Sequence, residues 1–143
     1  MDCLFYDEGL PNSHKSDYTN SGITVSYDTD GTKLTPTSTS SSTYTLNQTV
    51  VDGMCVEFDF KINTRNGNNI RFFIGGANIY YTSTEMDDGN IHHFKAIVNG
   101  ESISATVDDV SVGEGTRTSN TAIRFVLANE CVITFKNLKV YPI

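Results

Sequence analysis

The chain has 143 residues, a length that suits one domain with a hydrophobic core and hardly two. Ten Lys and Arg stand against 17 Asp and Glu, so the net charge is −7, the opposite of what a nucleic-acid-binding protein carries. Thr, Ser and Asn number 18, 13 and 13 and make up nearly a third of the chain. Thr favours strands, whereas Asn and Ser favour turns. The composition therefore predicts a single all-β domain over residues 1–143 that binds no nucleic acid.

The N-terminal half has several short strand signals. Residues 4–6 predict a short strand, and the polar residues 10–22 predict a long loop. Residues 23–27 alternate and turn at Asp30-Gly31 into Lys33-Leu34, which is typical of a hairpin. The Ser/Thr tract from Thr35 to Thr43 predicts a loop or a polar edge strand. Tyr44-Thr45-Leu46 follows as a further strand.

The second half alternates more clearly. Val56, Phe58, Phe60 and Ile62 share one face of a strand, and Glu57, Asp59 and Lys61 share the other. Asn99-Gly100 predicts a two-residue hairpin turn, and Asp108-Asp109 predicts another turn. The remaining strands are predicted at residues 70–74, 79–82, 91–98, 102–107, 110–112, 123–127 and 132–141. About ten or more short strands with such spacing favour a sandwich or a barrel.

Membrane and export signals are not apparent in the sequence. No apolar run approaches the roughly 20 residues that span a bilayer, so we expect no membrane insertion. The N-terminus has no basic flank and no long apolar stretch, unlike a signal peptide. We expect a domain excised from a longer protein. Cys3, Cys55 and Cys131 lack metal-site spacing and are expected to be small buried side chains rather than a disulfide framework.

Four segments resemble the concanavalin A-like jelly roll of lectins, laminin-G-type domains and noncatalytic carbohydrate-binding modules. They are Val56 to Ile62, Asp88 to Gly100, Ala105 to Asp109 and Ile133 to Tyr141. The resemblance rests on the order of these features along the chain. A strand is followed by an Asp-Gly turn with a histidine after it, then by an Asn-Gly hairpin, and the last strand contains Asn-Leu-Lys-Val. Ile91 replaces a usual Trp, and Asp109 replaces a usual Gly. The resemblance implies an antiparallel two-sheet β-sandwich.

The segment from Glu57 to Lys61 decides whether the resemblance extends to hydrolysis. Laminarinase-type enzymes on this fold carry a Glu-x-Asp-x-(x)-Glu strand, whose two glutamates act as nucleophile and acid/base. This sequence has the first two carboxylates but Lys61 at the third position. We therefore expect no enzyme. The alternative interpretation of Glu57 and Asp59 is the solvated face of a strand.

A sugar site needs aromatic stacking and a few aimed polar groups. If the apolar face of each strand lies in the core, then Glu57, Asp59, Arg71 and Phe73 face outward. Tyr80 or Tyr81, His93 or Lys95, and Arg124 join them. The predicted ligand-binding residues are Glu57, Asp59, Arg71, Phe73, Tyr80, Lys95 and Arg124. A surface merely covered by loops is an equal alternative, and Trp is absent.

No metal or cofactor is expected. Related modules hold Ca²⁺ between an N-terminal acid, here Asp7 or Glu8, and an Asp of the last strand. Lys136 occupies that last position, and its ammonium repels cations. His92 and His93 are adjacent in a strand, so they point to opposite faces and cannot chelate one ion together.

The sequence as a whole predicts a noncatalytic carbohydrate-binding or adhesion module. We expect it to belong to a virion protein, such as a tail or receptor-binding protein, or to an extracellular cell-surface protein. Its partner would be a cell-surface glycan, and its parent assembly would supply many copies. The alternative is a structural decoration or protein-interaction domain of a virion without a sugar site, and a glycoside hydrolase is disfavoured.

Overall fold

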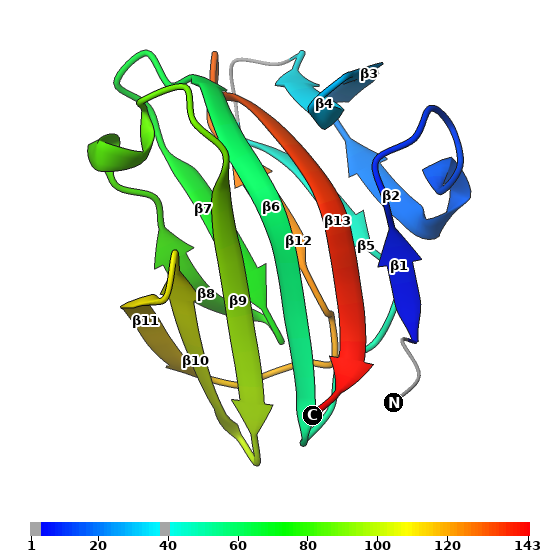
Figure 1. The fold of residues 1–143 in the computed structure, drawn as a ribbon, viewed down its shortest axis with the longest axis vertical. Helices are drawn as coiled ribbons and strands as arrows, with labels where there is room; N and C mark the ends of the chain where they lie inside the picture. Colours follow the sequence, from blue (N-terminus) through cyan, green and yellow to red (C-terminus); the bar gives the residue numbers. More distant parts are fainter. Residues whose placement is uncertain (1–3, 38–40) are drawn as a thin grey trace.

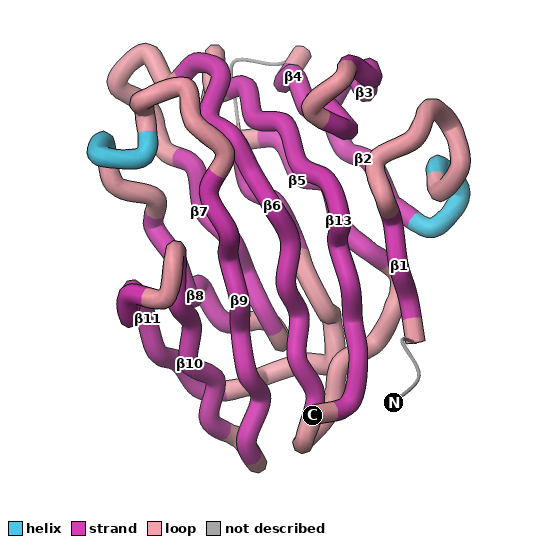
Figure 2. Tube along the Cα trace, viewed as in Figure 1, coloured by secondary structure: helices cyan, strands magenta, loops and turns pink. Residues whose placement is uncertain are grey.

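The computed structural model describes residues 4–37 and 41–143, which fold into strands joined by short turns. Thirteen strands lie within these residues (Figure 1). They are Phe5–Asp7 (β1), Tyr18–Ser21 (β2), Ile23–Asp28 (β3), Gly31–Pro36 (β4), Ser42–Leu46 (β5), Met54–Thr64 (β6), Ile70–Ile74 (β7), Ala77–Tyr81 (β8), His92–Asn99 (β9), Ser102–Val107 (β10), Val110–Thr116 (β11), Arg124–Leu127 (β12) and Val132–Pro142 (β13). Two short 3₁₀ helices, Lys15–Asp17 (η1) and Thr84–Met86 (η2), are cyan in Figure 2.

The strands form two antiparallel sheets. Sheet A has the order β11-β10-β9-β6-β13-β4-β3. Strand β1 pairs with β13 as well, on the same edge as β4 but nearer the C-terminal end of β13. Sheet B has the order β2-β5-β12-β7-β8. In Figure 1, β9, β6 and β13 cross in front of β7, β12 and β5 as a separate layer. The predicted all-β, two-sheet sandwich is confirmed.

Phenylalanine rings fill the space between the sheets. Six of the eight Phe are fully buried, three of which surround Phe58 with centroids 5.0–5.2 Å away. The buried six are Phe58, Phe60, Phe72, Phe94, Phe125 and Phe135. Edge-to-face packing of such rings adds to the free energy gained by their burial. Phe5 packs at the margin of this core, whereas Phe73 lies outside it.

Two local predictions were wrong. Residues 10–22 include η1 and strand β2, which pairs with β5 at the edge of sheet B. Strand β2 shows no clear alternation because only Tyr18 of its four residues is buried. The hairpin turn lies at Gly100-Glu101, since Asn99 pairs with Ser102. Gly100 adopts φ +64°, as the first turn position of a type II′ hairpin requires.

The cysteine prediction is confirmed for two residues. Cys55 and Cys131 are free thiols with fully buried side chains, and burial raises the pKa of both. Cys3 lies outside the described residues. Across residues 4–37 and 41–143, no helix has the length and apolar character needed to cross a membrane.

Candidate functional site

Strand β6 places its carboxylates on the surface of sheet A. Phe58 and Phe60 point into the core, so Glu57 and Asp59 lie on the opposite side, as the alternation predicts. The pairing register puts Tyr6, Lys139, Glu57 and Lys95 in one row across β1, β13, β6 and β9. We call the outward side chains of these four strands the sheet A face.

A continuous chain of hydrogen bonds and ion pairs crosses the sheet A face. Each residue in this chain contacts the next, and the chain joins four different strands. In order, Tyr6 donates to Asn137 (2.9 Å), Asn137 donates to Asp59 (2.9 Å), Asp59 contacts His93 Nδ1 (2.7 Å), His93 Nε2 contacts Glu57 (3.4 Å), and Tyr141 donates to Glu57. We call these six residues the polar chain. Their mutual contacts fix the side-chain rotamers and so preorganise the surface.

Glu57 is the most enclosed member of the polar chain. It is 8% exposed, and Lys139 Nζ lies 3.5 Å from its Oε1. Burial alone would raise the pKa of Glu57, but the Tyr141 hydroxyl and then the Lys139 ammonium outweigh it, so the net pKa falls below its ordinary value. Burial, together with contacts to Cys55 and Glu57, raises the pKa of Tyr141. Glu57 is therefore an ionised acceptor rather than a proton donor.

Asn137 enters the polar chain through an irregularity in β13. The pairing with β6 shifts between Lys136 and Lys139, and Asn137 adopts φ +53° in that bulge. Its amide consequently reaches Asp59 on one side and Tyr6 on the other. Four residues of this surface were not predicted as site residues from the sequence: Asn137, Tyr6, Lys139 and Tyr141. The signal for Asn137 was an Asn within a predicted strand, because Asn tolerates the left-handed conformation that a bulge requires.

Lys61 occupies the third outward position of β6, beyond Glu57 and Asp59. Its ammonium lies 2.6 Å from Asp30 Oδ2, in the turn between β3 and β4. The hydrogen bond from Lys61, followed by its positive charge, lowers the pKa of Asp30. A paired cation thus stands where a retaining glycosidase of this fold would need its second glutamate.

A hollow of about 500 Å³ extends the sheet A face beyond β9. Its polar lining comes from β10, β11 and the end of β9, namely Asn99, Ser102, Ser104, Glu114 and Thr116. Ser104 lies opposite Ile97 of β9, which is 36% exposed. Hydroxyl groups and one carboxylate therefore line this hollow, and Ile97 lies between it and β6.

Three other predicted residues lie on sheet B. Arg71 and Phe73 point outward from β7 because Ile70, Phe72 and Ile74 fill the core. Arg124 pairs directly with Phe73 across β12 and β7. The Arg71 guanidinium carbon lies 5.7 Å from the centroid of the Phe73 ring. We call the outward side chains of β5, β12, β7 and β8 the sheet B face.

The seven predicted residues therefore do not form one site. Glu57, Asp59 and Lys95 belong to the sheet A face, and Arg71, Phe73 and Arg124 belong to the sheet B face on the opposite side of the sandwich. The surface placement of Tyr80 was wrong, since its side chain lies in the core at 4% exposure. A bulge between Phe72 and Phe73 breaks the pairing with β8, so Tyr80 turns inward. Tyr81 takes the outward position at 52% exposure.

His92 and His93 point apart, as predicted. His93 belongs to the polar chain, whereas His92 contacts Asp88 at 2.9 Å and Asp108 at 2.6 Å. Burial alone would lower the pKa of His92, but the hydrogen bonds with these two carboxylates outweigh it and raise the pKa. The Asp88 pKa falls to about 2, chiefly through the backbone N–H of Asn90.

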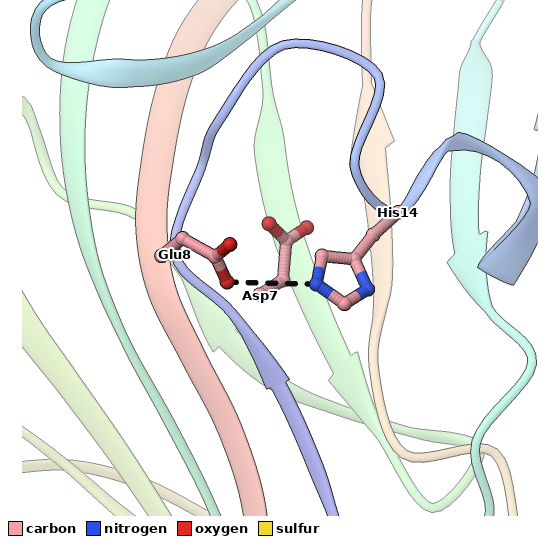
Figure 3. A group of neighbouring side chains, drawn as sticks. All are labelled: Asp7, Glu8 and His14. Carbon is pink, nitrogen blue, oxygen red and sulfur yellow. Dashed lines mark ion pairs between the residues drawn. The ribbon is translucent and has the colours of Figure 1, made fainter.

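One group of potential metal ligands occurs within the described residues, at Asp7, Glu8 and His14. Figure 3 shows the three side chains turned toward one another, with the Glu8–His14 ion pair of 3.5 Å dashed. The Asp7 oxygens accept hydrogen bonds from Gly9 N (2.8 Å) and Tyr18 Oη (2.7 Å). His14 also contacts Asp17 at 3.0 Å. These contacts account for the arrangement by tying the loop before β2 to β1.

Lys136 of β13 lies close to the turn that follows β1. A Cβ added at Gly9 would lie 3.0 Å from Lys136 Cβ, and one added at Gly31 would lie 2.8 Å from it. The expectation that no calcium binds between Asp7 or Glu8 and this strand stays a prediction.

No protein-family model and no curated protein sequence matches the chain. Solved structures do. A Bacillus subtilis protein of unknown function with a galectin-like fold has a TM-score of 0.75 at 12% identity, covering 99% of this chain and 96% of that one. The carbohydrate-binding module CBM66 from Bacillus subtilis has a TM-score of 0.62 at 14% identity, covering 87% and 94%.

A β-glucanase from Bacillus licheniformis is also similar, with a TM-score of 0.59 at 15% identity, covering 97% of each chain. Identities this low show the fold alone. Lectin-like, carbohydrate-binding and glucan-hydrolysing proteins all share it. The chain therefore has the galectin-like, concanavalin A-like jelly-roll fold.

Proposed function

We propose that this domain is a noncatalytic carbohydrate-binding module that holds a glycan on the sheet A face. It would serve adhesion within a larger virion protein or extracellular cell-surface protein. The polar chain is the observation that carries the proposal. It presents hydroxyl, amide, imidazole and carboxylate groups in fixed positions at the surface, and such preorganised groups bind sugar hydroxyls with little loss of conformational entropy.

Aromatic rings at the margin of the polar chain suit a sugar. Tyr6 is 45% exposed at the β1 end of the row, and Tyr141 is partly exposed on β13. A ring beside aimed polar groups can stack against the apolar face of a pyranose. The lysines of the row, Lys95 and Lys139, add donors for ring or hydroxyl oxygens.

The similar structures support the proposal without deciding it. CBM66 is a carbohydrate-binding module, and the Bacillus licheniformis protein is a β-glucanase. Lys61 favours the first of these roles for this chain. Its ammonium is neutralised by Asp30 and cannot replace a glutamate that protonates a leaving group.

A structural or protein-interaction role is the second candidate. One observation favours it, namely that the members of the polar chain already satisfy one another's hydrogen bonds. A decorative domain of a virion would need such a face only for stability and solubility. Measured glycan binding separates the two roles.

The experiment is a glycan array probed with multimerised domain, because single-site binding by such modules is weak and many copies strengthen it. Wild type is compared with Tyr6→Ala and Lys95→Ala, which alter the sheet A face. Leu10→Ala and Lys15→Ala are matched controls that leave both sheet faces unchanged, since Leu10 is 57% exposed in the loop after β1 and Lys15 lies in η1. We expect the first two variants to lose signal and the controls to keep it. Signal unchanged in both Tyr6→Ala and Lys95→Ala would overturn the site, and no signal on any glycan would favour the structural role.

A further inference from the structure

The sheet B face presents two rows of side chains that the proposed function does not use. The register places Thr45, Arg124, Phe73 and Asn78 side by side in one row. Thr43, Val126, Arg71 and Tyr81 form the second row. Arg71 and Arg124 are thus diagonal neighbours on adjacent strands, a relationship that sets their Cβ atoms about 7–8 Å apart.

The charge of the sheet B face is the reverse of the charge of the chain. The chain has a net charge of −7, yet these eight positions contain two arginines and no acid. The other two arginines serve the fold: Arg65 pairs with Asp87 at 2.8 Å and Arg117 pairs with Glu101 at 3.1 Å. Within residues 4–37 and 41–143, no carboxylate oxygen lies within 4.0 Å of Arg71 or Arg124.

Arg71 contacts an aromatic ring but lacks a hydrogen-bond partner at its Nε. Its guanidinium lies over Phe73, and its Nε is buried with no hydrogen-bond partner in the described part of the chain. A guanidinium that loses water without gaining an acceptor carries a free-energy cost. The two terminal nitrogens of Arg71 are not among the buried atoms without a partner, and such guanidinium nitrogens form paired hydrogen bonds with carboxylate and sulfate oxygens.

The neighbours of the arginines indicate what carries that anion. Tyr81 is 52% exposed beside Arg71, and Phe73, the one phenylalanine that contributes nothing to the core, lies between Arg71 and Arg124. Thr43 and Thr45 add hydroxyls on β5. Rings, hydroxyls and two free guanidiniums on one flat face match a sugar polymer that bears acid groups.

We propose that the sheet B face is a second glycan site, specific for acidic sugars, in which Arg71 and Arg124 bind the acid groups and Phe73 and Tyr81 contact the rings. The two sheets lie back to back, so this site is separate from the sheet A face and stands without it. A domain with both sites would bridge two glycan chains, or two parts of one.

The test is a calorimetric titration of the whole domain with three acidic probes: hexagalacturonate, sialyllactose, and a sulfated hexasaccharide from heparin. Methyl-esterified hexagalacturonate, lactose and a desulfated, N-acetylated and carboxyl-reduced hexasaccharide are the matched neutral probes. We expect at least one acidic probe to bind more tightly than its neutral counterpart. The carboxylated and sulfated probes distinguish the two sources of negative charge. Equal binding within every pair, or no binding of any acidic probe, would overturn the proposal.

Variants locate the site. Arg124→Gln is informative because Arg124 is exposed and removing its charge leaves the core intact. We expect it to weaken the acidic probe about tenfold or more. Arg71→Gln should act in the same direction, with unfolding followed to confirm that the fold persists. Lys15→Gln, which removes one positive charge from exposed η1 and leaves both faces unchanged, is the matched control. An equal loss in Lys15→Gln, or none in both arginine variants, would refute the assignment.

The outcome is distinguishable from failure of the proposed function. Tyr6→Ala reports on the sheet A face alone, and Tyr81→Ala reports on the sheet B face alone. A domain that binds acidic probes through Arg124 but shows no dependence on Tyr6 would keep the second site and lose the first. The converse pattern would keep the first site and refute the second.

Discussion

Asn137 bridges Tyr6 and Asp59, donating to Asp59 Oδ2 at 2.9 Å and accepting from Tyr6 Oη at 2.9 Å. It does so from a left-handed backbone conformation, φ +53°, at the bulge of β13. The Asn137 side chain therefore connects β1 to β6, two strands that do not pair with each other. Asn137 is thus the link in the polar chain between the Tyr6 hydroxyl and the Asp59 carboxylate.

We predict that Asn137→Gly lowers the free energy of unfolding by about 1–2 kcal/mol, because it removes two side-chain hydrogen bonds while glycine keeps the positive φ. Asn137→Ala should lower it further by about 1 kcal/mol, since alanine is strained in that conformation. Urea denaturation measures both. A glycine variant as stable as wild type would show that the bridge contributes nothing to folding.

The fold was predictable because the sequence alternates between apolar and polar residues from Val56 to Ile62 in β6 and from Phe94 to Asn99 in β9, apart from the exposed Ile97, and alternation indicates which residues are buried. Glu57 and Asp59 were placed on the surface by that pattern alone. Alternation does not report which sheet a strand joins. Arg71 and Glu57 both alternate with buried rings, yet β7 and β6 belong to opposite layers, so one predicted site became two faces.

Bulges are the second reason why side-chain positions did not follow from the sequence. The shift at Phe72–Phe73 turned Tyr80 inward and exposed Tyr81, and the shift at Lys136–Lys139 turned Asn137 toward Asp59. Each inserts one residue into a strand, and its position follows from contacts with a partner far along the chain. Strand β2 was missed for a related reason, since backbone pairing with β5 rather than burial creates it.

Hydrolysis offers a direct test of Lys61. We predict that wild type releases no reducing ends from β-1,3-glucan or mixed-linkage β-glucan, and that Glu57→Gln gives the same background. The physical reason is that Lys61, paired with Asp30 at 2.6 Å, supplies no proton where the acid/base would stand. Activity in wild type that disappears in Glu57→Gln would contradict the noncatalytic assignment.

Stability should fall as pH rises through the raised pKa of His92. The protonated ring is favoured by Asp108 and Asp88 in the folded state, so its contribution is complete below the ordinary value of 6.5 and is lost above the folded value. We predict that His92→Gln flattens this part of the curve in denaturation experiments from about pH 5 to about pH 9. The slope that remains comes from His14, whose pKa is also raised, and toward pH 9 from Cys55 and Cys131, whose pKa values burial raises. Parallel curves for wild type and His92→Gln would contradict the assignment.

Gly113 determines how closely β11 approaches β8 where the two sheets meet. A Cβ at this position would lie 1.8 Å from the Ile79 carbonyl oxygen, so Gly113→Ala must push the strands apart. We predict a loss of about 3 kcal/mol or more in unfolding free energy, at the upper end of overpacking costs, because the clash is with backbone. Gly53→Ala is the matched control: its added Cβ meets nothing within 4 Å, and only the strain of φ +81° remains. That control should lose about 1 kcal/mol. Equal losses of unfolding free energy in the two variants would contradict the prediction that close approach of β8 and β11 stabilises the fold. Hydrogen exchange gives a second test, because β11 amides that exchange no faster in Gly113→Ala than in wild type would show that the strands have not separated.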